Sequence, residues 1–324
     1  MALHDEASLA AAVAAFDEGR LVAIPTETVY GLAAPVDRPE LVERIFQLKG
    51  RPPGNPLIVH VASREQARAC VSEWPDLAEE LASHFWPGPL TLVLPKSAWI
   101  ADRISAGQPT VALRMPDHSL TLAFIRALGR PIVAPSANLF TRLSPTTAAD
   151  VVATFPNDQV LVLDGGACQV GIESTIVAID GPARTLWWLR PGRIGRAALR
   201  ALLPPGWRLA EAKERPGGEL GSPGRMQAHY RPDKPLRVHV VTDPEQAGRL
   251  RCRLDQDPRT FRMELPGHPE AAARCLYASL RRAELGDNEC IDLIVPQAWL
   301  AAPVWEGVIN RLRKAASEWR EPVR

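Results

Sequence analysis

The sequence predicts an α/β protein in two parts: a twisted, mixed, open β-sheet covered by helices, followed by a smaller Rossmann-like α/β domain. Three observations lead to this fold class. Apolar, strand-like runs alternate with helix-like segments over about 200 residues. Polar residues follow several of these runs, at the position where open α/β sheets bind ligands. A stretch rich in Gly, Pro and charge separates this region from a second strand–helix alternation, so we predict domains at residues 1–212 and 236–324 joined by a linker at 213–235.

The first domain is expected to begin with a helix at residues 8–16, with Ser8 as its candidate N-cap. Short apolar runs of strand length and amphipathic segments of helix length then follow one another. The expected strands lie at 21–24, 57–61, 90–94, 110–114, 131–134, 160–163 and 185–189, with another after Gly171. The expected helices lie at 39–47, 64–69, 76–85 and 119–128, and Ser144-Pro-Thr is expected to open one more.

In the second domain the same patterns predict strands at 236–241 and 291–295 and helices at 244–253, 269–283 and 304–318.

In the first domain, Thr26 and Thr28 follow the first expected strand and are expected at a strand-to-helix junction. Free backbone N–H groups and hydroxyls at such a junction can hold an anion, and an ordinary N-cap is the alternative interpretation.

Composition excludes several classes of function. The net charge is +1, so no global field draws the chain to nucleic acid or to a membrane surface, and no apolar run reaches the ~18 residues of a membrane span. The five cysteines contain no Cys-x-x-Cys, which argues against a disulfide framework or a zinc site and favours a reducing, cytoplasmic setting. The phosphate-binding P-loop, the dinucleotide fingerprint, the hydrolase elbow and the zinc-protease motif are all missing from the sequence.

Two polar pairs adjoin apolar runs and form the main candidate site. Lys49 and Arg51 lie two residues apart, as do Ser136 and Asn138. In extended chain such pairs point to one side, so the four side chains can line one pocket. Arg supplies a planar fork for phosphate and Lys a point charge, while Ser and Asn fix orientation, which favours a polyphosphate. A solvated surface is the alternative interpretation of the Lys-x-Arg step.

Longer motifs then show a resemblance. PTETVYGL, KGRPPGNPLIVH, WPGPLTLVL, TVALRMPDH, PIVAPSAN, GIESTIV and LRPG follow one another in the order and spacing of the YrdC-type L-threonylcarbamoyladenylate synthases. SPGRMQAHYRP resembles the linker of the long, two-domain form of that family, although Arg231 stands where the family more often has a small residue. RCLYASLRRAE and EGVINRLRKAA are similar to its C-terminal domain.

The resemblance implies that L-threonine, bicarbonate and ATP react to threonylcarbamoyl-AMP and pyrophosphate, and that the product feeds tRNA threonylcarbamoyladenosine modification through downstream transfer machinery. It implies catalytic roles for Lys49, Arg51, Ser136 and Asn138 around the nucleotide phosphates. Further ATP contacts are implied for Asn55, Thr110, Ser144 and Arg190, with Tyr230 as part of a lid. L-threonine would contact Thr28, His60, Arg114, the backbone of Ala134, and Ser174. Mg²⁺ would be held mainly by the phosphates, with no protein metal site.

Two other functions stay open at this point. An RNA-binding module is one, and direct tRNA binding remains undecided, although a net charge of +1 argues against a strong phosphate-neutralising surface. A carbamoyl transferase of the hydrogenase-maturation type is the other, since it shares a similar domain. That class would need acylphosphatase-like and zinc-finger segments, and the sequence contains no Cys-x-x-Cys.

Overall fold

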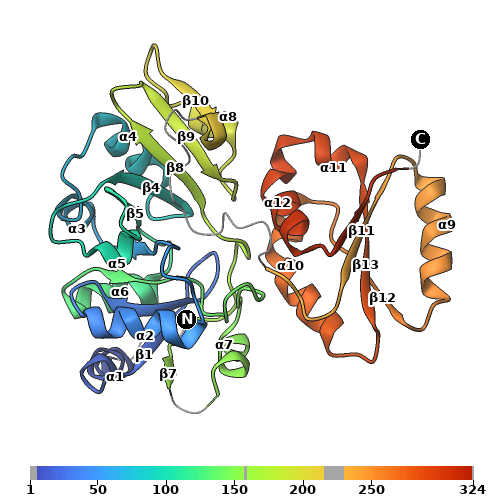
Figure 1. Ribbon diagram of the computed structural model, residues 1–324, viewed down its shortest axis with the longest axis horizontal. Helices are drawn as coiled ribbons and strands as arrows, with labels where there is room; N and C mark the ends of the chain where they lie inside the picture. Colours follow the sequence, from blue (N-terminus) through green and yellow to red (C-terminus); the bar gives the residue numbers. More distant parts are fainter. Residues whose placement is uncertain (1–5, 157–158, 215–229, 323–324) are drawn as a thin grey trace.

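The computed structural model describes residues 6–156, 159–214 and 230–322, which form two lobes side by side (Figure 1). The first lobe, residues 6–214, contains a mixed ten-stranded sheet in the order β10-β9-β8-β4-β5-β3-β6-β2-β1-β7. The second lobe, residues 230–322, contains a parallel four-stranded sheet in the order β12-β13-β11-β14. The predicted fold class, a mixed twisted sheet followed by a smaller α/β domain, is therefore confirmed.

The elements of the first lobe follow the predicted alternation closely. Its strands are β1 (Leu21–Ile24), β2 (Gly31–Pro35), β3 (Ile58–His60), β4 (Leu90–Pro95), β5 (Thr110–Arg114), β6 (Ile132–Val133), β7 (Val160–Val162), β8 (Thr175–Asp180), β9 (Thr185–Arg190) and β10 (Arg208–Glu211). Its helices are α1 (Glu6–Asp17), α2 (Pro39–Lys49), α3 (Arg64–Ala69), α4 (Asp76–Phe85), α5 (Asp102–Ser105), α6 (Ser119–Leu128), α7 (Ala148–Thr154) and α8 (Arg196–Arg200), with a 3₁₀ turn at Ala212–Glu214.

Strand registers bring residues that are distant in sequence to one place. β3 pairs in parallel with β5, which sets His60 opposite Arg114, and β6 pairs antiparallel with β3, which sets His60 opposite Ile132. These strands are apolar runs buried on both faces, as is usual for central strands covered by helices. The carboxyl ends of β3 and β5 therefore meet at His60 and Arg114. Ala134, which follows β6, lies beside the start of β3, where its N–H donates to the Ile58 carbonyl oxygen.

Three local predictions are wrong. α1 begins at Glu6, so Ser8 lies inside the helix and is not its N-cap. The chain after β1 turns directly into the antiparallel strand β2, so Thr26 and Thr28 lie in a strand-to-strand loop and not at a helix start. The Thr26 hydroxyl oxygen accepts hydrogen bonds from the backbone N–H groups of Thr28 and Val29, both at 3.2 Å, and this turn replaces the expected cap. Ser144 does not open α7, because Thr147 is its N-cap and forms a capping box with Asp150.

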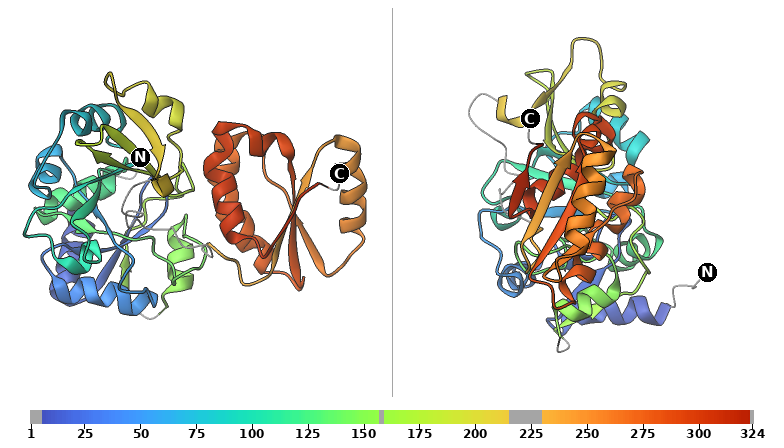
Figure 2. Two further views of the ribbon diagram at one scale, coloured as in Figure 1. Left: turned by 45° about the horizontal axis from the view of Figure 1, so that its top comes forward. Right: turned by 90° about the vertical axis from the view of Figure 1, so that its right-hand side faces the viewer.

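The second lobe has the same α/β character. Its strands are β11 (Leu236–Val241), β12 (Thr260–Met263), β13 (Cys290–Pro296) and β14 (Glu318–Arg320). Its helices are α9 (Pro244–Asp255), α10 (Pro269–Glu284), α11 (Gln297–Ala301) and α12 (Glu306–Ala315), with a 3₁₀ turn at Pro303–Trp305. α10 and α12 lie on the side of this sheet that faces the first lobe, and α9 lies on the far side (Figures 1 and 2). No helix in the described ranges has the length and apolar character needed to cross a bilayer.

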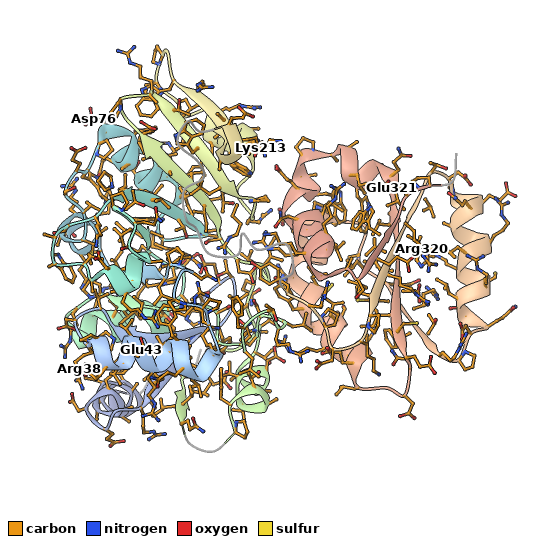
Figure 3. All side chains as sticks on the ribbon, in the orientation of Figure 1. Arg38, Glu43, Asp76, Lys213, Arg320 and Glu321 are labelled. Atoms are coloured by element: carbon orange, nitrogen blue, oxygen red, sulfur yellow. The ribbon has the colours of Figure 1, made fainter. Side chains whose placement is uncertain are left out.

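The two lobes share an apolar cluster. Val29, Leu143 and Ile172 of the first lobe pack with the apolar face of α10 and α12 in the second. Lys213, near the end of the first lobe, faces the second lobe and shares a groove with Trp299 and Arg313 (Figure 3). The predicted linker at 213–235 falls largely outside the described residues. Its last part, from Tyr230, is described and packs against both lobes.

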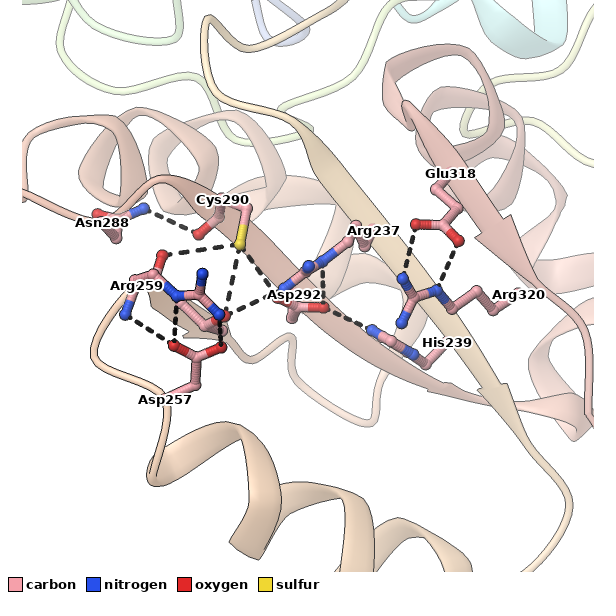
Figure 4. Close-up of polar contacts among 10 residues, drawn as sticks. Arg237, His239, Asp257, Arg259, Asn288, Cys290, Asp292, Glu318 and Arg320 are labelled. Carbon is pink, nitrogen blue, oxygen red and sulfur yellow. Dashed lines mark hydrogen bonds and ion pairs between the residues drawn. The ribbon is translucent and has the colours of Figure 1, made fainter.

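A buried carboxylate is the centre of a hydrogen-bond network on the smaller sheet (Figure 4). Asp292 on β13 is fully buried and accepts hydrogen bonds from His239 Nε2 at 2.5 Å and from Arg237 Nε at 2.9 Å. Burial raises the pKa of Asp292, but these hydrogen bonds outweigh it and bring the pKa down to about 2. Because the folded-state pKa is depressed, Asp292 stabilises the fold above its ordinary pKa, and this stability is lost as the pH falls towards 2.

Asp292→Asn is therefore expected to lower the free energy of unfolding by about 3–5 kcal/mol at pH 7, since it breaks a buried charge network. The difference from the natural chain should shrink as the pH falls from 4 to 2. Urea unfolding at several pH values measures both effects. Asp257→Asn is the matched control, because Asp257 pairs with Arg259 at a partly exposed position and is expected to cost under ~1 kcal/mol. Equal effects of the two substitutions would contradict this account.

Candidate active site

The candidate site is a cavity along β3 and the carboxyl end of β5, with a volume of about 580 Å³ that includes space open to solvent. Its wall combines the Thr26–Gly31 loop, the Arg51–Ile58 segment and the Ala134–Ser136 loop. Many of the residues predicted for the site line this cavity. Those residues are Thr28, Arg51, His60, Arg114, Ala134, Ser136, Arg190 and Tyr230.

Arg51 lines one end of this cavity, and Lys49 hydrogen-bonds to Ser136, which also lines it. The two residues are not in extended chain as predicted. Lys49 ends helix α2, and Gly50 follows in the left-handed region at φ 61°, which favours glycine at a helix C-terminus. The Lys49 ammonium donates hydrogen bonds to the carbonyl oxygens of Ser136 and Asn138, both at 2.5 Å. Arg51 donates to the carbonyl oxygens of Asn55 at 3.1 Å and Pro56 at 2.7 Å. Lys49 thus ties α2 to the Ser136–Asn138 loop.

Both cations are buried without a carboxylate partner among the described residues. Lys49 is 2% exposed and Arg51 8%. Burial lowers the pKa of Lys49 well below its ordinary value, and the charge of Arg51 lowers it further. Burial also lowers the pKa of Arg51, to about 9. A bound anion would offset these desolvation costs, since an opposite charge nearby favours the charged form of both groups.

Two amides beside the cations have unpartnered polar atoms. Asn55 Nδ2 and Asn138 Oδ1 are both buried and have no hydrogen-bond partner in the part of the chain that the structure describes. Asn138 Nδ2 donates to the carbonyl oxygens of Leu139 and Arg142, which fixes the side chain. Buried polar groups are normally hydrogen-bonded, so these two atoms mark places where a ligand supplies an acceptor and a donor.

Arg114 and His60 lie at the other end of the cavity, opposite each other on β5 and β3. Arg114 Nη2 lies 2.7 Å from Glu27 Oε2, and Arg114 Nε donates to the carbonyl oxygen of Gly88 at 3.3 Å. His60 Nδ1 lies 3.2 Å from the carbonyl oxygen of Ile58. Burial and then the charge of Arg114 lower the pKa of His60 to about 3. The imidazole is therefore neutral at physiological pH, with Nδ1–H donating to Ile58 and Nε2 left as an acceptor.

Arg190 and Ser174 connect the site to β8 and β9. Arg190 Nε donates to the Ser174 carbonyl oxygen and Nη2 to the Ser174 hydroxyl oxygen, both at 3.0 Å. The Ser174 hydroxyl also lies 2.7 Å from that of Thr91. This network fixes the Ser174 side chain next to the cavity wall.

Tyr230 closes the side of the cavity that faces the second lobe. It is 1% exposed and adopts a positive φ of 61°, and the next residue, Arg231, donates its backbone N–H to the carbonyl oxygen of Thr141. The Tyr230 ring lies 5.8 Å from that of Tyr277 and 5.5 Å from the Arg311 guanidinium carbon. The end of the linker is thus clamped between the lobes with its aromatic ring in the cavity wall.

Comparisons with known proteins find relatives that match nearly the whole chain. Residues 14–192 match the Sua5, YciO and YrdC family, described as "Telomere recombination", and residues 194–317 match the family "Threonylcarbamoyl-AMP synthase, C-terminal domain". Threonylcarbamoyl-AMP synthase of Bacillus subtilis is 36% identical, with 96% of this chain and 94% of the relative covered. The enzyme of that name from Pyrococcus abyssi is 36% identical over 92% of this chain and 91% of its own length.

The chain belongs to the threonylcarbamoyl-AMP synthase family. A crystal structure of P. abyssi Sua5 complexed with L-threonine superposes with a TM-score of 0.87 at 34% identity and covers 98% of this chain and 97% of that one. The predicted enzyme class, a synthase of threonylcarbamoyl-AMP, is thereby confirmed, and the hydrogenase-maturation and RNA-binding-module alternatives are set aside. The match spans both lobes, so this threonylcarbamoyl-AMP synthase has the long, two-domain form.

Some predicted positions lie outside the cavity wall of this synthase. The residues concerned do not line the cavity, but each hydrogen-bonds to a residue that does: Lys49, Asn55, Asn138 and Ser174. Ser144 donates to Glu173, which does line it, at 2.6 Å. Thr110 is the first residue of β5 and Arg114 the last, so the two lie about 13 Å apart at ~3.3 Å per residue. A role for Thr110 therefore requires a ligand that extends along β5 past Asn55.

Sequence reasoning missed four charged or polar residues at the site: Glu27, Glu173, Tyr277 and Arg311. Glu27 pairs with Arg114, and Glu173 lines the cavity. Glu27 lies inside the motif TETVYGL and Glu173 inside GIESTIV, so the sequence alone could have indicated both. Tyr277 and Arg311 come from the second lobe, more than one hundred positions away from Glu173, and only the docking of the two lobes reveals their place.

Proposed function

We propose that the cavity binds ATP, as its Mg²⁺ complex, side by side with L-threonine, and that bicarbonate supplies the carbamoyl carbon. The observation that carries this proposal is the pair of buried cations, Lys49 and Arg51, whose hydrogen bonds in the described residues go to carbonyl oxygens and not to carboxylates. The unpartnered Nδ2 of Asn55 adds a buried donor at the same end of the cavity. Donors of this kind suit a polyphosphate.

We assign the opposite end to L-threonine. Arg114 offers a guanidinium to the threonine carboxylate, with Glu27 holding one side of it in place. The neutral His60 offers Nε2 as an acceptor for the threonine ammonium or hydroxyl. Thr28, Ala134 and Ser174 would complete this subsite. The related P. abyssi Sua5 crystallised in complex with L-threonine, which supports the assignment.

The proposed chemistry needs positioning and charge neutralisation more than acid–base groups. The neutral amine of threonine attacks bicarbonate, or CO₂ formed from it, to give a carbamate with loss of water. A carbamate oxygen then attacks the α-phosphorus of ATP, the bond from that phosphorus to the bridging oxygen breaks, and pyrophosphate leaves. Lys49, Arg51 and the Mg²⁺ of the nucleotide complex would stabilise the charge on the phosphates.

Further ATP contacts are assigned to the residues around these two ends. Ser136 and Asn138 would orient the phosphates. Ser144 and Arg190 would contact ATP on the side of the cavity that faces the second lobe. Asn55 and Thr110 would meet the part of the nucleotide that extends along β5. Tyr230 would exclude water from the reactive carbamate and mixed anhydride, which hydrolyse easily.

The product would serve tRNA modification, as the family assignment indicates, with a separate transfer enzyme as its consumer. We also propose that the chain divides at residues 1–212, 213–235 and 236–324, and that it works in the cytoplasm, where its five free cysteines would stay reduced.

Pyrophosphate release tests the proposed substrates directly. With ATP, Mg²⁺, L-threonine and bicarbonate all present, we expect steady release. Omission of either threonine or bicarbonate should lower the rate to the background of buffer without enzyme. Release that continues at the full rate without one of them would refute the proposed reaction.

A further inference from the structure

The second lobe places two side chains against a carboxylate of the proposed active site. Glu173 lies in the loop before β8 and lines the cavity. Its carboxylate accepts hydrogen bonds from Arg311 Nε at 2.8 Å and from the Tyr277 hydroxyl at 3.0 Å. The hydroxyl of Ser144 donates to the same carboxylate at 2.6 Å. We call Ser144, Glu173, Tyr230, Tyr277 and Arg311 the interlobe cluster.

Arg311 on α12 is the central member of the interlobe cluster. It is fully buried, and its Nη2 donates to the Glu173 backbone oxygen at 3.0 Å while its Nη1 donates to the Pro191 carbonyl oxygen. Its guanidinium lies over the Tyr230 ring. One side chain of the second lobe therefore holds the Glu173 loop, the segment that follows Arg190, and the end of the linker at the same time.

Arg311 also determines the charge that the cavity wall presents. Burial raises the pKa of Glu173, but the charges of Arg311 and Arg190 outweigh it and bring the pKa to about 2. The titratable groups that face Glu173 are Arg190 from β9, Tyr230, Tyr277 from α10 and Arg311 from α12. Burial raises the pKa of both tyrosines, so they are neutral donors here. Arg311 is thus the cation that hydrogen-bonds to the Glu173 carboxylate.

An unneutralised Glu173 would oppose the proposed reaction. Its carboxylate would repel the triphosphate in the same cavity, and it would draw Arg190 away from Ser174. Arg190 now holds both the carbonyl and the hydroxyl of Ser174. The contacts of Arg311 prevent both effects while its stacking keeps Tyr230 in the wall.

We propose that Arg311 and Tyr277 are positioning residues for the synthase reaction: they neutralise and orient Glu173 from the second lobe, so that the nucleotide site in the first lobe is complete only when the lobes are docked. This inference rests on the proposed binding of ATP in the cavity. The second lobe thus contributes to the reaction in the first lobe through the Arg311 guanidinium and the Tyr277 hydroxyl.

Arg311→Met tests the inference, because methionine keeps much of the side-chain volume and removes the charge. Without Arg311, the effect of burial on the Glu173 carboxylate is offset mainly by the charge of Arg190 and the Ser144 hydrogen bond, so the pKa of Glu173 rises. The remaining negative charge then depends on pH. We expect kcat/KM for ATP to fall at least 10-fold at pH 8, and the deficit to be smaller at pH 6, because a raised pKa increases the protonated fraction of Glu173 as the pH falls. Tyr277→Phe, which removes one donor only, should give a smaller loss in the same direction.

The double variant Glu173→Gln/Arg311→Met separates charge from structure. It removes both charges, so we expect it to recover most of the pH 8 loss and to show the pH profile of Glu173→Gln. Arg313→Met is the matched control on the same helix, since Arg313 is exposed and packs on Trp319 outside the interlobe cluster. It should leave the kinetics of the natural chain unchanged.

Two results would overturn the inference. One is natural kinetics in Arg311→Met at both pH values. The other is a loss that is equal at pH 6 and pH 8 and is not recovered in the double variant, which would make Arg311 a merely structural residue. If Arg311→Met does not fold, Tyr277→Phe carries the test, and its natural kinetics would reject the proposal. Failure of the natural chain itself to release pyrophosphate with threonine and bicarbonate would instead reject the proposed substrates.

Discussion

Lys49→Ala is expected to lower kcat/KM for ATP by about 10²–10³-fold, the usual cost of removing one preorganised charge donor from a developing anion. The ammonium is buried at the end of α2 and hydrogen-bonds to the Ser136 and Asn138 carbonyl oxygens. Its loss removes a phosphate contact and also frees the loop that carries Ser136. Steady-state pyrophosphate release at varied ATP concentration measures the effect.

Lys96→Ala is the control for this experiment. Lys96 also donates to a backbone carbonyl oxygen, that of Ile100 at 2.9 Å, and pairs with the exposed Asp102, and it does not line the cavity. We expect its kinetics to stay within about 2-fold of the natural chain, since a surface ion pair contributes little. A similar fall in both variants, or less than a 10-fold fall in Lys49→Ala, would remove Lys49 from the proposed phosphate site.

Arg114→Gln is expected to raise the KM for L-threonine by about 100-fold, because a charge-assisted contact to the threonine carboxylate is lost while hydrogen-bonding capacity remains. The KM for ATP should change much less. The same substitution should lower the free energy of unfolding by about 3–5 kcal/mol, since it leaves Glu27 as a buried, unpaired carboxylate. Kinetics at varied threonine and urea unfolding measure the two effects separately.

Glu27→Gln/Arg114→Gln separates binding from stability. With both charges gone, the stability should largely return, while the KM for threonine should stay high. Arg130→Gln is the control, because Arg130 pairs with Asp37 at an exposed position and should affect neither quantity by a measurable amount. A KM for threonine that recovers together with stability would show that Arg114 acts through the fold and not through the substrate.

The apolar periodicity of the sequence was sufficient to predict most elements of the fold. Runs such as Leu21–Ile24 and Thr110–Arg114 are buried strands as expected, because central strands need apolar residues on both faces. β2 was missed because Gly31–Pro35 lacks β-branched residues and follows a Thr-rich turn that looks like a helix start. β12 and β14, which form the two edges of the small sheet, are short and carry charged residues that hide the strand pattern.

The candidate site was predictable to the extent that its residues lie at strand ends. His60 and Arg114 meet where the parallel strands β3 and β5 end, and the antiparallel β6 brings Ser136 to the other end of the short strand β3. The expectation of extended chain at Lys49 and Arg51 was wrong, since a helix end and a left-handed glycine set the directions of these side chains. Arg311 could not be found from local pattern, because a single Arg on an amphipathic helix is usually solvated, and only the packing of two lobes buries it.

The central claim is that one cavity holds the nucleotide and the amino acid together. A crystal structure of the enzyme with L-threonine, Mg²⁺ and α,β-methylene-ATP, in which the scissile bridging oxygen is replaced, tests it most directly. We expect the phosphates within hydrogen-bond distance of Lys49 and Arg51, and the threonine carboxylate beside Arg114 in the same cavity. Nucleotide or threonine bound elsewhere, with these three side chains left without ligand contacts, would contradict the account.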